Sequence, residues 1–130
     1  MLLPSDRFFS ETHFWLKKVE NDLLIGVTDY AQDCIGPIEY LDLPVVGGQL
    51  SKGSCFGSAE SSKAVTDLLA PLDAIVAEVN LNLDDEPSLV NESPYDKGWM
   101  LRLTNYNSGV LDSFIDSEAY KALLKSLGIE

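Results

Sequence analysis

Short runs of strand-forming residues, separated by turn residues, constrain the fold of this chain more than any other feature of its sequence. Residues 14–19 and 23–27 are two such runs with a turn sequence between them, so we expect a β-hairpin. Further strand-like runs follow at residues 38–43, 55–60, 64–69, 75–79 and 99–103. In the last run Trp99, Leu101 and Leu103 alternate with other residues and are expected on one face. Many short strands joined by turns predict a small antiparallel sandwich or barrel.

The middle of the chain contains one helix signal and one acidic segment. Thr28 or Asp29 can cap a short helix over residues 30–35, and Gly36-Pro37 ends it, because Gly favours the left-handed cap and Pro cannot continue a helix. Residues 81–93 are acidic and are expected to form an irregular, solvated surface segment.

The C-terminal part of the chain changes to a helical period. Residues 118–127 place four apolar residues on one helical stripe, namely Tyr120, Leu123, Leu124 and Leu127. Ser117 is the expected N-cap and Gly128 the expected C-terminal cap, and a shorter helix is expected around residues 110–115. The sequence therefore predicts one mainly β domain over residues 1–130, with a C-terminal helix packed on it.

The acidic balance of the chain limits its partners. There are 21 Asp and Glu residues against 9 Lys and Arg, a formal charge of −12, which repels nucleic-acid phosphates and anionic membrane surfaces. We expect no nucleic-acid or membrane partner and instead expect proteins with basic faces. The alternative is that the charge only keeps the protein soluble. No apolar run approaches the roughly 20 residues of a membrane helix and the N-terminus does not resemble a targeting peptide, so we expect a cytoplasmic protein.

No catalytic or metal-binding set is visible in the sequence. His13 is the single histidine, and a lone histidine within a strand is more often a structural, hydrogen-bonded residue than a general base. Nucleophile-elbow, phosphate-loop and dinucleotide motifs are absent. The adjacent acids at 84–86 lack the spacing of a calcium loop, and Cys34 and Cys55 are expected to be buried free thiols. The sequence therefore does not describe an enzyme.

Lys63 is the residue that most needs a functional interpretation. It lies between two strand-like runs, at the expected tip of a hairpin, where rigid strands present a residue to an approaching molecule. Its neighbours are small, namely Ser61, Ser62 and Ala64. A lysine ε-amine is a usual acceptor of an amide-linked modification. The two interpretations are an acceptor lysine and an ordinary exposed surface lysine.

Five motifs in a fixed order extend the analysis to nearly the whole chain. They are Thr12-His13-Phe14-Trp15, Gly26-Val27-Thr28-Asp29-Tyr30-Ala31-Gln32-Asp33, Tyr40-Leu41-Asp42-Leu43-Pro44, Glu60-Ser61-Ser62-Lys63-Ala64, and Leu89-Val90-Asn91 followed by Ser93-Pro94-Tyr95 and Gly98-Trp99. In this order they are similar to the motifs of the glycine cleavage H proteins, a family of lipoyl carriers. The resemblance covers residues 8–124 and implies a lipoyl-domain-like hybrid of barrel and sandwich with short helices and a C-terminal helix.

The resemblance also implies a site. Lys63 would carry lipoic acid in amide linkage, and the rest of its modification motif is Glu60, Ser61 and Ala64. Asp67 and His13 would lie near the loaded lipoyl group. No catalytic residue and no metal are implied.

The partners implied by the resemblance make the protein a carrier without catalytic activity. A pyridoxal-phosphate-dependent glycine decarboxylase would load it with the aminomethyl group of glycine. A folate-dependent aminomethyltransferase would then unload it, and dihydrolipoamide dehydrogenase would reoxidise it. A lipoate–protein ligase or lipoyl transferase would attach the lipoyl group.

The sequence departs from the family pattern at Phe14 and Pro37, at Glu39, where the family usually has an apolar residue, and at Asp73-Ala74-Ile75, where it commonly has Ser-Gly-Glu. Phe14 replaces a glutamate that the family typically has between its histidine and tryptophan, and Pro37 replaces an acidic residue. Asp67 is retained. Because these changes spare the attachment motif, a second hypothesis is a lipoylated H-like protein that serves as a lipoyl donor or as a carrier for another redox partner. A third hypothesis is an unmodified interaction module.

Overall fold

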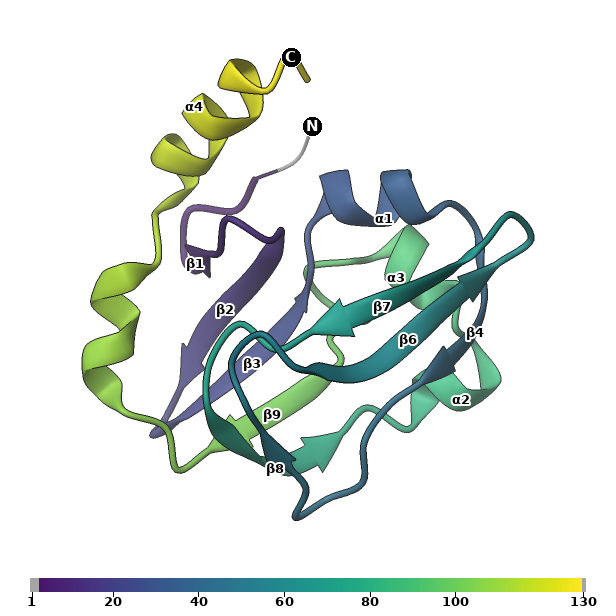
Figure 1. Cartoon of the computed structure of the whole chain (residues 1–130), viewed down its shortest axis with the longest axis horizontal. Coiled ribbons are helices and arrows are strands. Elements are labelled where there is room, and N and C mark those ends of the chain that lie inside the picture. The colour runs from purple at the N-terminus through teal and green to yellow at the C-terminus, as the bar shows by residue number, and fades with distance from the viewer. Residues whose placement is uncertain (1–2, 130) are drawn as a thin grey trace.

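The computed structural model describes residues 3–129 and arranges their strands in two antiparallel sheets (Figure 1). The six-stranded sheet has the order β1 (Phe8–Phe9), β2 (Phe14–Val19), β3 (Asp22–Val27), β9 (Leu101–Thr104), β8 (Ala74–Val79), β5 (Gln49–Leu50). The three-stranded sheet has the order β4 (Ile38–Asp42), β6 (Cys55–Ser61), β7 (Val65–Leu69). The prediction of a mainly β, barrel–sandwich-type fold with a C-terminal helix is confirmed.

Two apolar clusters hold these layers together. The larger cluster joins inward-facing residues of both sheets, among them Leu16, Ile25, Leu41, Ala59, Leu68 and Leu103. The smaller cluster consists of Phe9, Trp15, Tyr120 and Leu124, and thus joins β1 and β2 to the C-terminal helix. Successive residues of a strand face opposite sides, so Trp15 and Leu16 serve the two clusters separately. The helix therefore packs on the face of the large sheet that the barrel core does not use.

The two main helices form where the sequence predicts them. Helix α1 (Asp29–Ile35) is capped by Thr28, whose hydroxyl accepts from the Ala31 N–H at 3.2 Å. It ends at Gly36, with φ of 85°. Helix α4 (Ser117–Ser126) is capped by Asp116, whose carboxylate accepts from the Ala119 N–H at 2.8 Å. The predicted N-cap Ser117 is wrong by one residue, because Asp116 supplies a better placed acceptor.

The acidic segment is more ordered than expected. It forms two short helices, α2 (Asn82–Asp85) and α3 (Leu89–Glu92), and these bury Leu83 and Val90 in the main core. The prediction of an irregular segment is therefore wrong, since two apolar side chains anchor it despite its charge. Gly98 packs so closely on this segment that a Cβ would lie 2.7 Å from the Leu89 carbonyl oxygen.

Smaller corrections concern the ends of elements near the C-terminus. Strand β9 begins at Leu101, so Trp99 lies outside the strand in which it was expected. Trp99 is partly buried and packs on the smaller cluster, while Met100 is fully buried. The expected helix at 110–115 is a 3-10 helix, η1 (Ser108–Ser113). Ile115 instead pairs with β1 through two backbone hydrogen bonds to Phe9, at 2.7 and 2.9 Å. This short pairing is non-local, and it takes the residue out of the helix.

The expected burial of the two cysteines is also wrong. Cys34 and Cys55 are free thiols, as predicted, but both are exposed. Cys34 lies on α1, none of whose residues is fully buried, and Cys55 begins β6 beside an irregularity in its register with β7. Neither position faces the core.

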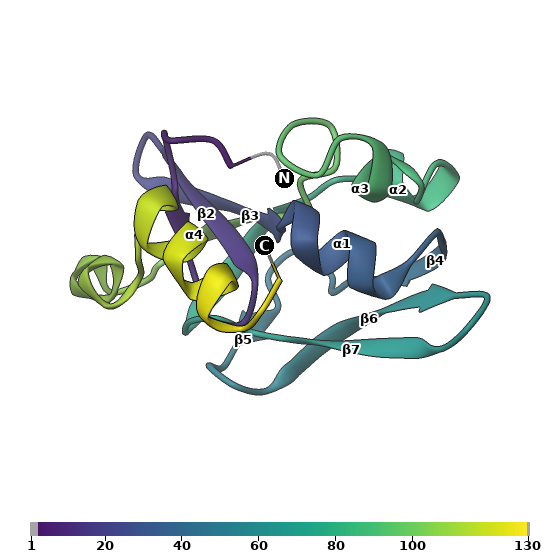
Figure 2. The same cartoon turned by 90° about the horizontal axis from the view of Figure 1, so that it is seen from above.

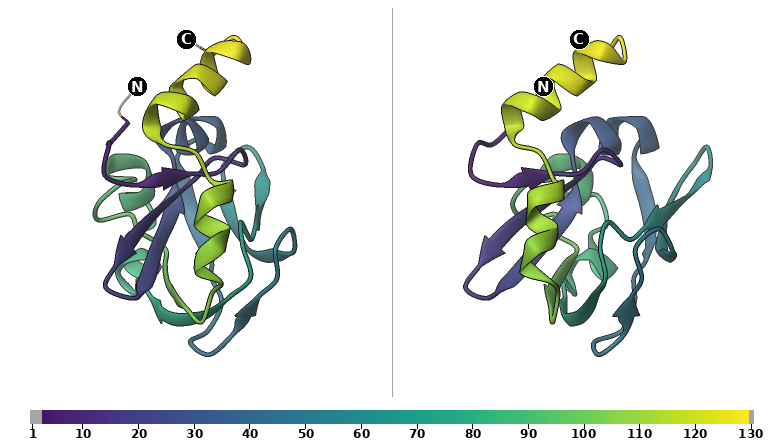
Figure 3. Two further views of the ribbon diagram at one scale, coloured as in Figure 1. Left: turned by 90° about the vertical axis from the view of Figure 1, so that its left-hand side faces the viewer. Right: turned by 60° about the vertical axis from the view of Figure 1, so that its left-hand side comes forward.

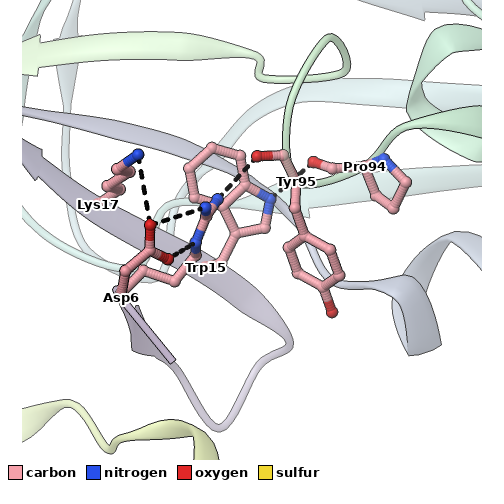
Figure 4. Close-up of polar contacts among 6 residues, drawn as sticks. Asp6, Trp15, Lys17, Pro94 and Tyr95 are labelled. Carbon is pink, nitrogen blue, oxygen red and sulfur yellow. Dashed lines mark hydrogen bonds and ion pairs between the residues drawn. The ribbon is translucent and has the colours of Figure 1, made fainter. Parts of the chain in front are cut away.

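A polar cluster beside β2 fixes the position of α1. The Arg7 guanidinium donates to the Tyr95 carbonyl oxygen at 2.7 Å and lies 4.8 Å from the centroid of the Trp15 ring. The Trp15 indole N–H donates to the Pro94 carbonyl oxygen at 2.8 Å (Figure 4). The Tyr95 hydroxyl accepts from the backbone N–H of Asp29 at 2.9 Å, at the first residue of α1. The segment before β9 is thereby tied to β2 and to the start of α1.

The β6–β7 hairpin extends beyond the rest of the body, on the side away from α4 (Figures 1 and 3). In Figure 2 this hairpin lies below α1, so helix and hairpin form neighbouring layers. None of the helices in residues 3–129 is long and apolar enough to cross a membrane.

Candidate functional site

The tip of the β6–β7 hairpin is held by Ser61. Its backbone N–H donates to the Ala64 carbonyl oxygen at 3.0 Å. Its hydroxyl accepts from the Lys63 N–H at 3.3 Å and donates to the same Ala64 oxygen at 3.4 Å. Ser61 is only 7% exposed, so its polar side chain serves the turn rather than solvent. A side chain that bonds to nearby backbone groups fixes a turn in this way.

Lys63 lies outside this hydrogen-bonded turn and is exposed. Glu60 and Asp67 are near it in sequence, but within residues 3–129 no ion pair involves its amine. The side chains of Ser62 and Ala64 beside it are small and exposed too. The amine is therefore accessible from outside, which fits the interpretation of Lys63 as an acceptor.

Replacing Ser61 by Ala is expected to loosen the tip. The variant keeps the backbone bond to Ala64 and loses both weak hydroxyl bonds, so we expect a loss of about 1 kcal/mol or less in the free energy of unfolding. Faster hydrogen exchange of the Lys63 amide, measured by NMR, is the more specific readout. Ser62→Ala is the matched control, because Ser62 is exposed; equal exchange rates in the two variants would contradict the role of Ser61.

A cleft of about 360 Å³ adjoins the hairpin. Its walls are residues 66–69 of β7, residues 12–14 before and at the start of β2, and Tyr30, Ala31, Cys34 and Ile35 on α1, with Val27 from β3. Most of this lining is apolar. Asp67 supplies the one carboxylate among the lining residues. It lies four residues after Lys63, or roughly 13 Å away at about 3.3 Å per strand residue. We call this space the β7 cleft.

Phe14 forms part of the apolar wall of the β7 cleft. It is 4% exposed and belongs to the main core, and its ring lies 5.9 Å from that of Phe56, centroid to centroid. Phe14 thus stands between cleft and core, and it offers no charge to a cationic group in the cleft.

His13 lies at the edge of the cleft in a chain of hydrogen bonds that reaches α4. Its Nδ1 is 2.8 Å from the Tyr120 hydroxyl, which is 2.8 Å from the Thr28 hydroxyl. His13 has φ of 71° and lies in the turn before β2. The prediction of a structural, hydrogen-bonded histidine is therefore confirmed, while its predicted place within a strand is wrong.

Burial shifts the pKa values of His13 and Tyr120 in this series of hydrogen bonds. It lowers the pKa of His13 and raises the pKa of Tyr120 to about 12, although the Thr28 hydroxyl acts in the opposite direction on Tyr120. His13 is accordingly neutral at pH 7. Because its folded pKa lies below its unfolded value of 6.5, protonation favours the unfolded chain. Neutral His13 therefore stabilises the fold relative to protonated His13. This stabilisation is fully present above pH 6.5 and is lost as the pH falls through the folded pKa.

Tyr120→Phe tests the link between α4 and the cleft. The substitution keeps the ring that stacks on Phe9 at 4.8 Å and leaves His13 and Thr28 without their shared partner. We expect the free energy of unfolding in urea to fall by about 1–3 kcal/mol. The control is Tyr40→Phe, because the Tyr40 side chain is exposed and its loss of a hydroxyl should change little; equal effects would show that the Tyr120 hydroxyl contributes nothing specific.

The structure brings the predicted residues together in two groups. Lys63 and Ser61 lie at the tip with Ala64, while Asp67 and His13 line the β7 cleft. Glu60 lies on the exposed face of the small sheet, opposite Val65. Sequence analysis missed the cleft residues Tyr30 and Cys34 and the partner role of Tyr120. The spacing of Tyr30 and Cys34, four residues apart on a predicted helix, indicates a common face but not what that face adjoins.

No group of three or more His, Cys, Asp or Glu side chains within residues 3–129 is arranged to hold a metal ion. What the arrangement does offer is a reachable primary amine at the tip of a hydrogen-bonded hairpin, with an apolar cleft beside it.

Comparisons with known proteins agree with this geometry. The family model described as "Glycine cleavage H-protein" matches residues 7–127. The chain is 42% identical to a "Glycine cleavage system H protein" of Thermus thermophilus over 126 residues, 97% of this chain and 98% of that protein. It is also 42% identical to the protein of the same name from Listeria innocua over 121 residues, 93% and 97% of the two chains. The crystal structure of a glycine cleavage system H protein from Mycobacterium marinum superposes with a TM-score of 0.80 at 27% identity, covering 92% of this chain and 97% of that chain.

Proposed function

The chain belongs to the glycine cleavage H-protein family, and from this premise we propose that Lys63 carries a lipoyl group in amide linkage. Its function is that of the lipoyl carrier of glycine cleavage. In the proposed cycle the carrier takes the aminomethyl group of glycine from a decarboxylase to an aminomethyltransferase. We call the modified Lys63 side chain the lipoyl arm.

The single observation that carries the assignment to Lys63 is its place in the hairpin tip. The amine is exposed and unpaired within the described residues, between small neighbours, on a turn that Ser61 holds. An enzyme that attaches a group in amide linkage needs such access. The paired strands β6 and β7 hold the tip in place while the enzyme approaches the amine. Glu60, Ser61 and Ala64 complete the motif around it.

The β7 cleft fits a lipoyl group in size and polarity. Its wall is largely apolar, with Phe14, Val27 and Leu68 among its residues, and a dithiolane ring on a hydrocarbon chain is apolar too. When bound, the lipoyl group supplies a disulfide that can be opened by reduction and closed by oxidation. The protein's own residues attach it at Lys63, exclude water from it along Phe14 and Leu68, and offer one carboxylate, Asp67, to a cationic cargo.

The proposed partners are a pyridoxal-phosphate-dependent glycine decarboxylase, a folate-dependent aminomethyltransferase, dihydrolipoamide dehydrogenase, and a lipoate–protein ligase or lipoyl transferase. The formal charge of −12 favours partners with basic faces, because opposite fields speed their encounter. A carrier with a mobile arm can serve several active sites in turn at high effective concentration. The cytoplasmic location expected from the sequence stays a prediction.

The alternative of a lipoyl donor outside glycine cleavage receives no support from the comparisons. Both quoted relatives and the superposed structure bear the name glycine cleavage system H protein.

The experiment that tests the proposal is intact-mass measurement with peptide mapping on protein from its native source. A lipoyl adduct on the peptide containing Lys63 would establish the carrier site. An unmodified Lys63, in cells that lipoylate other proteins, would overturn the assignment. Glycine-dependent loading of the modified protein by the decarboxylase then tests the cargo.

A further inference from the structure

Two of the sequence motifs contain polar residues that the site described so far does not use. They are Asp29 and Gln32 on α1, and Asn91 on α3. Helix α3 lies beside α1 (Figure 2), and hydrogen bonds join the three side chains to one another. None of the three lines the β7 cleft. They can therefore act on the cleft only through α1, which forms part of its wall.

The side-chain amide of Asn91 uses both its nitrogen and its oxygen in hydrogen bonds. Its Nδ2 donates to the Gln32 Oε1 and to the Gly36 carbonyl oxygen, both at 2.9 Å. Its Oδ1 accepts from the Ile38 N–H at 2.9 Å. Two donors and an acceptor on one short side chain are the property of an amide. Asn91 therefore binds the end of α1 and the first residue of β4 at the same time.

The link between α1 and β4 leaves exactly these backbone groups without a partner of its own. It consists of Gly36 and Pro37. Pro37 has no N–H, and the Gly36 N–H bonds to the Gln32 carbonyl oxygen at 2.9 Å. The Gly36 C=O and the Ile38 N–H remain, and a buried backbone group without a partner costs free energy. Asn91 satisfies both of them.

Asn91 projects from a firmly packed base, whereas α1 has little packing of its own. Val90, next to Asn91, is fully buried, and a Cβ on Gly98 would lie 2.9 Å from the Val90 Cα. Helix α3 thus has no room to shift toward Gly98. No residue of α1 is fully buried. Polar contacts therefore contribute much of what holds α1, with Tyr95 at its first residue and Asn91 at its end.

The residues of α1 that face α3 and those that face the cleft lie on different sides of the helix. Positions 29, 32 and 36 are three and four residues apart and share one side. The side that lines the cleft carries Tyr30, Ala31, Cys34 and Ile35. The hydrogen bonds to Asn91 therefore hold α1 from behind, and they fix where its cleft side lies.

The bond to Ile38 connects the same side chain to the opposite wall. Ile38 begins β4 and lies opposite Ser61 of β6 in the register. Strand β6 pairs in turn with β7, which lines the cleft through residues 66–69. Asn91 is thus bonded both to the helix on one side of the cleft and to the sheet on the other.

We propose that Asn91 is a positioning residue that sets the width of the β7 cleft by holding the end of α1 against the start of β4. The inference rests on the proposed function, since the carrier uses this width only if the cleft receives the lipoyl group. Asn91 itself makes no contact with that group. When its amide is removed, the Tyr95 hydroxyl and the Thr28 cap still hold the start of α1, so we expect the helix to pivot about its start.

Asn91→Ala, with Asn80→Ala as its matched control, tests the geometry in the unmodified protein. Asn80 is 4% exposed and donates to the carbonyl oxygens of Lys97 and Trp99 at 2.9 and 2.8 Å, away from α1. Residual dipolar couplings of backbone amides report the orientation of α1 relative to the sheets. We expect them to change over α1 in Asn91→Ala and to stay unchanged there in Asn80→Ala. An unchanged α1 in Asn91→Ala, or the same change in both variants, would overturn the inference.

The loaded carrier supplies the functional readout. Water converts an aminomethyl thioether to a thiol, formaldehyde and ammonium, so ammonium release measures how well the cargo is shielded. We expect release several-fold faster from Asn91→Ala than from the unsubstituted protein or Asn80→Ala. Equal release from all three would overturn the inference and leave the proposed function standing. Failure of the decarboxylase and glycine to load the unsubstituted, lipoylated protein would instead overturn the proposed function.

Gln32→Ala keeps the inference testable if Asn91→Ala does not fold. It removes the bond from Asn91 and the bond that Gln32 Nε2 donates to the Asp29 carboxylate at 2.8 Å, while Asn91 keeps its bonds to the link between α1 and β4. We expect the couplings of α1 to change in the same direction as in Asn91→Ala, by less. Asp33→Ala is the control, because Asp33 is the exposed neighbour on the same helix. Equal couplings in these two variants would overturn the inference.

Discussion

Lys63→Arg is expected to abolish lipoylation completely while leaving the fold unchanged. Arginine keeps the positive charge, but its guanidinium stays protonated and cannot act as the acceptor amine. Lys63 makes no ion pair in the described residues and its side chain is exposed. Substitutions at such positions usually change the free energy of unfolding by less than about 0.5 kcal/mol, so the melting temperature should shift by no more than about 2 °C.

The measurement is the intact mass after incubation with a lipoate–protein ligase, lipoate and ATP. Lys52→Arg is the matched control, because Lys52 is another exposed lysine in a turn and its loss should leave lipoylation complete. A lipoyl adduct on the Lys63→Arg protein would place the attachment site elsewhere. A large fall in melting temperature would show that Lys63 has a packing role that its exposure does not reveal.

The parts of the fold that depend on local patterns were predictable from the sequence. Runs of strand-forming residues separated by turn residues located the β2–β3 and β6–β7 hairpins, and capping residues located α1. The short helices α2 and α3 were not predicted, because their stability comes from burying Leu83 and Val90 against distant strands. Their own sequence is acidic and has weak helical periodicity.

The same division holds for the site. Local sequence singles out Lys63, because the turn that carries it and the small residues around it are adjacent in the chain. The β7 cleft could not be predicted, since its walls come from β7, from α1 and from the turn before β2, which meet only in the folded chain. The hydrogen bond between His13 and Tyr120 joins residues 107 positions apart, and no local signal connects them. Sequence analysis therefore finds the attachment point and, through the resemblance, Asp67 and His13 of the cleft, while the rest of the cleft wall requires the structure.

Phe14→Glu is expected to destabilise the protein strongly. The family pattern suggests that a glutamate at this position would give the cleft a second carboxylate, but here the side chain is 4% exposed and packs on Phe56. Removing a buried phenylalanine typically costs about 3–5 kcal/mol, and burying a carboxylate adds to this cost. We expect this loss in urea unfolding, whereas Phe14→Leu should lose less than about 1.5 kcal/mol because it stays apolar.

The pH dependence separates the cost of the charge from the cost of the lost ring. Burial would raise the pKa of the introduced carboxyl above the unfolded value of about 4.3. The folded variant then binds more protons than the unfolded chain, so its stability falls as the pH rises from about 4.3 to the raised folded pKa. Phe14→Gln has nearly the same shape without the charge, so Phe14→Glu should match it near pH 4 and become less stable than it near pH 8. If the two variants stay equally stable across this range, the introduced carboxylate has reached solvent or a partner in the cleft, and the apolar wall at Phe14 is open enough to admit the glutamate of the family pattern.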